Sequence, residues 1–209
     1  MPHKFDPAHR ERLEHPDRLR LLPPRDLLIR AGLRVGIVAA DVGCGPGFFA
    51  LPAAQIVGPA GRVYAVDIHR EMLEAVQNKA RDAGLPNIET VLAKESAIPL
   101  PDGVAQVVLL AFVLHEAVDP AAFAREAARI LAPGGHLLLL EWKREEMPAG
   151  PPMHDRVTPQ EAEGWLTSAG LRIVDRFEPN PYHYGFVGQA STSRLTGPAT
   201  GPQLTHPGH

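Results

Sequence analysis

The hydrophobic and polar residues of this chain follow two alternating patterns between residues 23 and 190. In the first pattern, short apolar runs are bounded by Gly, Pro, Asp or Asn, as is typical of strands in a buried sheet. The run over 103–114 is apolar almost throughout, which indicates a strand covered on both faces. We predict strands over 37–43, 61–68, 87–93, 103–114, 136–142, 171–179 and 182–190.

The segments between these runs show the second pattern, in which apolar residues recur with helical spacing. The clearest case is 69–84, where the apolar positions share one face and Gly84 can end the helix. Thr158 before Pro159 is typical of a helix start. We predict helices over 23–33, 45–58, 69–84, 119–135 and 158–170.

Strands that alternate with helices predict an α/β fold, with one mostly parallel sheet between two helical layers. The last two strands are joined only by Asn180 and Pro181, which is too short for a crossover, so they form an antiparallel hairpin. In such sheets ligands bind beyond the carboxyl ends of the strands. We therefore expect function in the loops after the first, second, fourth and fifth strands, and at the hairpin turn.

Both ends of the chain differ in composition from this domain, which we place at 23–190. Residues 1–22 are charged and predict an N-terminal helical segment, either a solvated helix or a lid with His15 or Arg18 facing inward. Residues 191–209 are rich in Gly, Pro, Ser and Thr without apolar periodicity, which predicts a disordered tail.

A glycine loop follows the first strand and carries the first chemical signal. Gly43, Gly45 and Gly47 are spaced G-x-G-x-G, whereas the dinucleotide fingerprint is G-x-G-x-x-G. The carboxylate of Asp41 beside this loop would repel a pyrophosphate and attract an ammonium group. The loop therefore favours a nucleoside with a cationic tail and no phosphate, such as S-adenosylmethionine.

Asp67 ends the second strand, twenty residues beyond Gly47. An acid at this place can accept hydrogen bonds from both ribose hydroxyls. The competing interpretation is that Asp67 caps the helix that starts near His69.

The bulk composition excludes several classes of function. With 209 residues and a formal net charge of −3, the chain carries no basic field that would recruit nucleic acid or an anionic membrane. Its single cysteine, Cys44, allows no intrachain disulfide or thiolate metal cluster, and its histidines lack metal-ligand spacing, so we predict no metal. No apolar run is long enough to span a bilayer, and the polar start predicts no signal peptide. We expect a cytoplasmic protein.

Four segments together resemble the motifs of class I S-adenosylmethionine-dependent methyltransferases, in order and spacing. They are ADVGCGPGFF, VYAVDIHREML, IPLPDGVAQVVLLAFVLHE and RILAPGGHLLLLEW. The resemblance covers about residues 20–190 and is similar to the small bacterial type that includes ubiquinone/menaquinone-biosynthesis methyltransferases. It implies a Rossmann-like three-layer sandwich whose seven-stranded sheet has the order 3-2-1-4-5-7-6, with an antiparallel last strand.

The resemblance also implies which residues hold the cofactor. The loop from Asp41 to Gly47 would hold the methionine part, Asp67 the ribose, and Ile68 the adenine. The family's acidic residue for the adenine amino group aligns here with Lys94, so we assign that role to Glu95, with a backbone contact from Ser96 or Ala97. Phe112, which follows the fourth strand, would flank the transferable methyl group.

Candidates for catalysis and acceptor binding follow from the same strand ends. His115 is a candidate general base, or else a histidine satisfied by a backbone carbonyl, and His183 at the hairpin turn is a second candidate. The candidate substrate residues are Trp142, His154, Tyr182 and Tyr184. The alternative is that Tyr184 belongs to the core and that the loop with His154 is simply solvated.

We therefore predict a methyltransferase that uses S-adenosylmethionine, releases S-adenosylhomocysteine and acts on a small-molecule acceptor rather than nucleic acid. The residues do not distinguish carbon, oxygen, nitrogen and sulfur as the acceptor atom. Two alternatives stand beside it: a nicotinamide-dependent oxidoreductase, which the loop spacing and Asp41 disfavour, and a non-catalytic adenosylmethionine-binding module.

Overall fold

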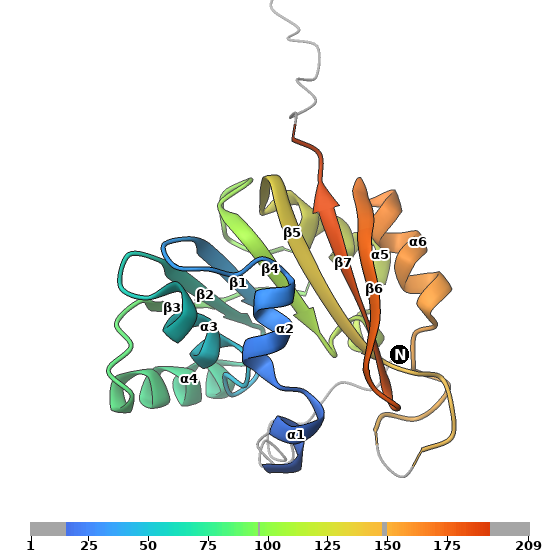
Figure 1. Cartoon of the computed structure of the whole chain (residues 1–209), viewed down its shortest axis with the longest axis horizontal. Helices are drawn as coiled ribbons and strands as arrows, with labels where there is room; N and C mark the ends of the chain where they lie inside the picture. Colours follow the sequence, from blue (N-terminus) through green and yellow to red (C-terminus); the bar gives the residue numbers. More distant parts are fainter. Residues whose placement is uncertain (1–15, 96, 148–149, 193–209) are drawn as a thin grey trace, which may run out of the picture.

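Seven strands form a single sheet in the order β3-β2-β1-β4-β5-β7-β6 (Figure 1). The structure is a computed structural model and describes residues 16–95, 97–147 and 150–192. The strands are β1 Val38–Val42, β2 Arg62–Asp67, β3 Ile88–Leu92, β4 Ala105–Ala111, β5 Leu131–Trp142, β6 Leu171–Asn180 and β7 His183–Ala190. β1 to β5 pair in parallel, and β7 runs antiparallel to both β5 and β6. The predicted α/β class, strand order and antiparallel last strand are confirmed.

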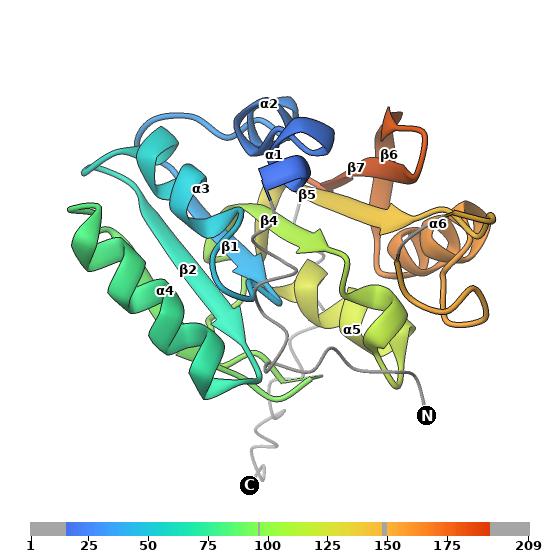
Figure 2. The same cartoon turned by 90° about the horizontal axis from the view of Figure 1, so that it is seen from below.

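Helices cover both faces of this sheet, as Figure 2 shows from below. They are α1 Pro16–Leu21, α2 Pro24–Arg30, α3 Ala50–Val57, α4 Arg70–Asp82, α5 Pro120–Arg129 and α6 Pro159–Ser168. Apolar residues of α2, α3 and α4 pack in one core cluster, and those of α5 and α6 pack in another. The sheet therefore separates two hydrophobic cores, one for each helical layer.

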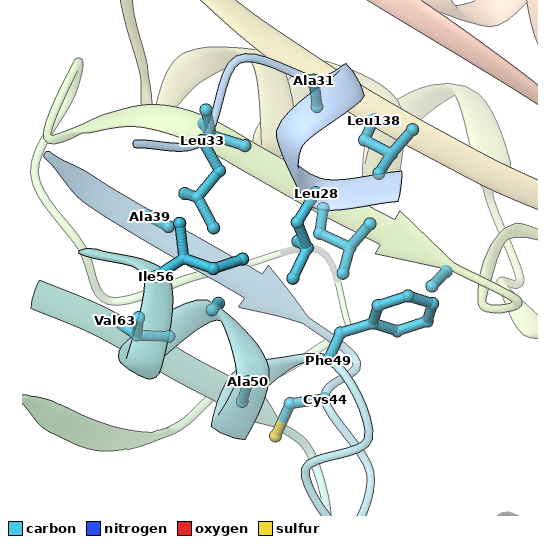
Figure 3. Close-up of a cluster of buried hydrophobic side chains, with 14 of the residues drawn as sticks. Leu28, Ala31, Leu33, Ala39, Cys44, Phe49, Ala50, Ile56, Val63 and Leu138 are labelled. Atoms are coloured by element: carbon cyan, nitrogen blue, oxygen red, sulfur yellow. The ribbon is translucent and has the colours of Figure 1, made fainter. Parts of the chain in front are cut away.

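Alternation along the strands decides which core each side chain enters. In β5, Leu138 and Leu140 belong to the core under α2, α3 and α4, whereas Leu137 and Leu139 belong to the core under α5 and α6. Figure 3 shows the first of these clusters, where Leu28 of α2 and Phe49 beside α3 approach the sheet. Both sides of the central strands are apolar because both sides are covered.

Several element boundaries differ from the sequence prediction; the helix predicted over 119–135, for example, ends at Arg129. β5 begins at Leu131 rather than at 136, because Leu131 already pairs with Ala105 before the register shifts. The predicted strand over 103–114 ends at Ala111, since Phe112 adopts a positive φ of 62°. A 3-10 helix, Leu114–Glu116, follows that turn.

The predicted terminal segments fall largely outside the described residues. This holds for the disordered tail beyond 192 and for the first fifteen residues of the N-terminal segment. Within the described part of that segment, α1 is a short helix. No helix among the described residues is long and apolar enough to cross a membrane.

Gly61 offers a test of the packing between α3 and β2. A Cβ at this position would lie 2.5 Å from the Val57 Cβ and 2.6 Å from the Ile37 carbonyl oxygen. Because backbone cannot yield cheaply, we expect Gly61→Ala to cost about 1–3 kcal/mol of unfolding free energy, measured by urea denaturation. Gly164→Ala in α6 is the matched control. Its Cβ would meet nothing within 4 Å, so stability should stay unchanged or rise.

Candidate functional site

A pocket opens at the carboxyl ends of β1, β2 and β4, the edge at which the sequence predicts ligand binding. Its lining combines four acidic residues, the backbone of the glycine loop, aromatic rings and one guanidinium group. The predicted cofactor residues that line it are Asp41, Gly43, Gly45, Asp67, Ile68, Glu95 and Phe112. Gly47 does not line the pocket but turns the loop towards α3 with a φ of 94°.

Asp41, the penultimate residue of β1, carries a buried carboxylate with one unsatisfied oxygen. It is 4% exposed, and its Oδ2 has no hydrogen-bond partner. Burial and the nearby charge of Asp67 together raise the pKa of Asp41 to about 7, against the opposing effects of Arg18 and the Ala50 backbone N–H. A buried acceptor without a donor is costly unless a ligand supplies one. Asp41 is therefore an acceptor suited to an ammonium group.

Asp67 joins the glycine loop to the start of α4. Its Oδ2 accepts a hydrogen bond from the Gly45 N–H at 2.9 Å, and its Oδ1 accepts one from the His69 N–H at 2.9 Å. The His69 ring Nδ1 also lies 3.2 Å from Oδ1, so Oδ2 is the oxygen with acceptor capacity left towards the pocket. The N-cap of α4 is His69, so Asp67 supports the turn before the helix rather than capping it.

Gly43 is required for a steric reason. A Cβ there would lie 2.3 Å from Cγ1 of Val113, and its φ is 74°. The glycine lets the first turn of the loop pass directly over the segment that follows β4. That segment includes Phe112, so the two sides of the pocket meet here.

Ile68 and Met72 add apolar side chains to the pocket lining, and Ile68 is 39% exposed. Glu95 also lines the pocket, and its Oε1 accepts a hydrogen bond from the Val118 N–H. Ser96, predicted to contact the adenine, lies outside the described residues.

Arg18 of α1 lines the pocket. Its guanidinium carbon stands 4.3 Å from the Phe48 ring centroid and 5.5 Å from that of Phe112. Burial lowers the pKa of Arg18 to about 10, while the charge of Asp41 opposes that shift. Even so, the side chain stays charged at neutral pH.

A cluster of three rings lies beside the pocket, formed by Phe112, Trp142 and His183. The ring centroids of Trp142 and His183 are 4.3 Å apart, and those of Phe112 and His183 are 4.9 Å apart. The three residues come from the ends of β4, β5 and β7. The structure thus brings together two predicted substrate or catalytic residues and the residue expected beside the methyl group.

His115 is held by a buried carboxylate, a partner that sequence reasoning did not identify. Its Nδ1 lies 2.9 Å from Oε2 of Glu141, which is fully buried and also accepts a hydrogen bond from the Trp142 N–H. Burial by itself lowers the pKa of His115, but the charge and hydrogen bond of Glu141 outweigh it and raise that pKa. His115 does not line the pocket. It therefore ties the turn after β4 to the end of β5.

Three predicted substrate residues lie away from the pocket. Tyr184 is buried in the core under α5 and α6, where its hydroxyl donates to the Val157 carbonyl at 3.0 Å. His154 has a side chain that is 83% exposed and pairs with Asp155 at 3.6 Å. Tyr182 is partly exposed at the hairpin turn, 6.4 Å from the His183 ring. Tyr184 thus has a core role, because alternation along β7 turns it to the opposite face from His183.

Hydrogen bonds from one of its own side chains hold the loop after β5. The buried Arg156 donates hydrogen bonds to the carbonyl oxygens of Pro151, Lys143 and Glu145. Nothing in the sequence pattern identifies this role, since the three acceptors are backbone atoms. Among the described residues, no group of three His, Cys, Asp or Glu is placed to hold a metal ion.

The fold is a seven-stranded α/β sheet with a glycine loop and a buried carboxylate at one edge, and comparisons with known proteins identify its family. The family described as a methyltransferase domain matches residues 40–139. The crystal structure of a SAM-dependent methyltransferase from Aquifex aeolicus is 35% identical, with a TM-score of 0.84, and covers 89% of this chain and 99% of that chain. The chain belongs to the class I S-adenosylmethionine-dependent methyltransferase family.

Two further relatives limit what this membership implies. A ubiquinone/menaquinone biosynthesis C-methyltransferase from Hahella chejuensis is 37% identical over 120 residues, covering 57% of this chain and 48% of that protein. The chain thus spans about half the length of the curated relatives it matches. The [4+2]-cyclase SpnF shares the fold alone, at 18% identity and a TM-score of 0.72 over 83% of this chain and 81% of that one.

The His115–Glu141 pair predicts a pH-dependent contribution to stability. Because the folded-state pKa of His115 is raised, the pair stabilises the protein fully below the unfolded pKa of about 6.5 and loses this as pH rises through the folded value. We expect urea unfolding to show a steeper loss of stability as pH rises above about 6.5 in the wild type than in Glu141→Gln. Parallel pH profiles would contradict a charged pair.

Proposed function

We propose that this chain binds S-adenosylmethionine in the pocket and transfers its methyl group to a small-molecule acceptor. The observation that carries the proposal is the unsatisfied Oδ2 of Asp41, a buried anionic acceptor beside a glycine loop. The cofactor offers an α-ammonium group and no phosphate, so it suits this carboxylate where a pyrophosphate would be repelled.

The remaining residues match the other parts of the cofactor. Asp67 would accept the ribose hydroxyls, because both of its oxygens are already oriented by backbone N–H groups. Ile68 and Met72 offer an apolar wall for the adenine, with Glu95 at its edge. Arg18 would meet the α-carboxylate, since its guanidinium lies in the same pocket as Asp41.

When bound, the cofactor supplies a methyl group on a positively charged sulfur. The protein's task is then to align the acceptor with that methyl and to keep water away. Phe112 and the rings of Trp142 and His183 stand at the strand ends where this alignment would take place. The name of the Hahella relative makes an acceptor carbon one candidate, to be tested by analysing the methylated product.

A non-catalytic module is the second candidate, and SpnF, a cyclase in name, is a reminder that this fold also serves other purposes. The two are separated by whether bound cofactor is consumed. A protein that binds S-adenosylmethionine but releases no S-adenosylhomocysteine with any acceptor would favour the module.

The ribose role of Asp67 is tested by calorimetric titration with S-adenosylmethionine, S-adenosylhomocysteine and NADH. We expect binding of the first two without NADH, and Asp67→Ala should weaken both by at least about tenfold, or 1.4 kcal/mol. Asp82→Ala, an exposed acid near the end of α4, is the matched control and should bind normally. A melting curve shows whether loss of the contacts to Gly45 and His69 has unfolded the variant. Unchanged affinity would remove Asp67 from the site.

Ionisation of Asp41 should have opposite effects on cofactor binding and on the stability of the empty protein. Its pKa of about 7 means that affinity for the cofactor should rise roughly tenfold from pH 5.5 to pH 7, below the titration of the cofactor's own amino group near 7.7–8.0. Asp41→Asn should bind weakly, without this pH dependence. Because the folded pKa exceeds the ordinary 3.8, ionising Asp41 costs stability as pH rises, so Asp41→Asn without cofactor should be the more stable form at pH 8. A less stable variant there would overturn this reasoning.

A further inference from the structure

Arg18 brings a guanidinium group into the lining of the pocket from α1, which lies outside the sheet. Its guanidinium carbon stands 4.3 Å from the Phe48 ring centroid and 5.5 Å from that of Phe112. Phe48 directly follows the glycine loop, and Phe112 follows β4. The guanidinium is thus within reach of both segments that meet at this end of the pocket, and the two ring faces stabilise its positive charge.

The backbone that carries Arg18 is fixed at the end of α1. The Arg18 carbonyl accepts a hydrogen bond from the Leu22 N–H at 2.8 Å, and Leu22 is buried in the core under α2, α3 and α4. The Leu21 carbonyl accepts a hydrogen bond from the Asn180 side chain at 2.8 Å, which joins α1 to the end of β6. Because these anchors lie outside α1, the fold itself sets where Arg18 lies.

Arg18 and Asp41 act on each other's charge. The Asp41 carboxylate counters the lowering of the Arg18 pKa, and the Arg18 charge counters the raising of the Asp41 pKa. Asp67 has the opposite effect on the pKa of Asp41, because two like charges oppose each other. This end of the pocket therefore combines two carboxylates with one positioned cation, and its affinity for a ligand depends on the charge of that ligand.

Methyl transfer changes the charge of the ligand in this pocket. S-adenosylmethionine and S-adenosylhomocysteine share the ammonium group, the carboxylate, the ribose and the adenine, but only the first has a positively charged sulfur. That sulfur joins the methionine part to the ribose. With the ammonium group at Asp41 and the ribose at Asp67, it would lie between these two carboxylates, in the pocket that Arg18 also lines. The carboxylates attract the sulfonium charge, and Arg18 repels it.

We propose that Arg18 is a specificity-determining residue that lowers the affinity of the pocket for S-adenosylmethionine relative to S-adenosylhomocysteine, by repelling the sulfonium charge that only the first ligand carries. This inference rests on the proposed function, since it concerns the cofactor of that same site. Its consequence is regulation by product. Methyl transfer removes the repelled charge, so the product is retained and competes with fresh cofactor.

A purely structural role for Arg18 leads to a different expectation. If the side chain only packed against Phe48 and Phe112, its loss would weaken the binding of both ligands by the same factor. A contact with the α-carboxylate would also affect both ligands alike, because both carry that group. Both ligands likewise offer Asp41 the same ammonium group. The ratio of the two dissociation constants therefore isolates the interaction of Arg18 with the sulfonium charge.

The test is calorimetric titration of the full chain with both ligands at about pH 7. In Arg18→Met, the ratio of the Kd for S-adenosylmethionine to the Kd for S-adenosylhomocysteine should fall by at least about tenfold, because the repelling charge is gone. Arg18→Lys keeps a cation and should stay near the wild-type ratio. Arg20→Met is the matched control on the same helix, since the Arg20 side chain is 80% exposed, and it should leave both constants unchanged.

Two further measurements separate the charge of Arg18 from other effects. Sinefungin carries an amine in place of the methylated sulfur, and in Arg18→Met it should gain affinity relative to S-adenosylhomocysteine, as S-adenosylmethionine does. Lys94→Met removes another cation of the pocket lining, in the loop after β3, and should change the ratio less. If a melting curve shows that Arg18→Met is unfolded, Arg18→Gln takes its place with the same expected ratio.

Three outcomes would overturn the role of Arg18. They are an unchanged or higher ratio in the folded neutral variant, a shift in Arg18→Lys as large as that in Arg18→Met, and an equal shift in Lys94→Met. Failure of the wild type to bind either S-adenosylmethionine or S-adenosylhomocysteine would instead overturn the proposed function.

Discussion

The alternation of side chains across a sheet that is covered on both faces is the constraint on which this site depends. Along β5, Trp142 faces the side of Leu138 and Leu140, while Glu141 faces the opposite core. Along β7, His183 and Tyr184 are divided in the same way. One face therefore collects the rings beside the pocket, and the other collects the groups that hold the strand ends in place. A register shift of one residue would exchange the two sets.

The two buried histidines show how the surroundings give the same side chain different chemistry. His115 lies against the carboxylate of Glu141, which favours its charged form. His183 lies among apolar rings and near Arg18 and Lys143, which favour its neutral form. The first histidine joins two strand ends as half of an ion pair, and the second keeps a lone pair available. The sequence around each histidine does not reveal this difference, because the groups that set its charge state come from other segments of the chain.

The buried carboxylate of Asp41 connects stability with binding. The fold places it at the end of β1, next to Asp67 and under the glycine loop, where ionisation is unfavourable without a cation. Arg18 of α1 moderates that cost from the other side of the pocket. A cationic ligand at this carboxylate would recover part of the free energy lost by burying the charge.

The sequence by itself determined the fold class, the glycine loop with Asp41 and Asp67, and Phe112 at the mouth of the pocket, because these follow from local periodicity, turn chemistry and spacing. Tertiary structure decided what depends on contacts between distant segments. These are the Glu141 partner of His115, the inward position of Arg18, and Asn180 as the link from Leu21 to His183. It also placed Tyr184 in the core and His154 on the exposed surface, outside the pocket lining. Partners far apart in the chain leave no local pattern, so only packing could bring them together.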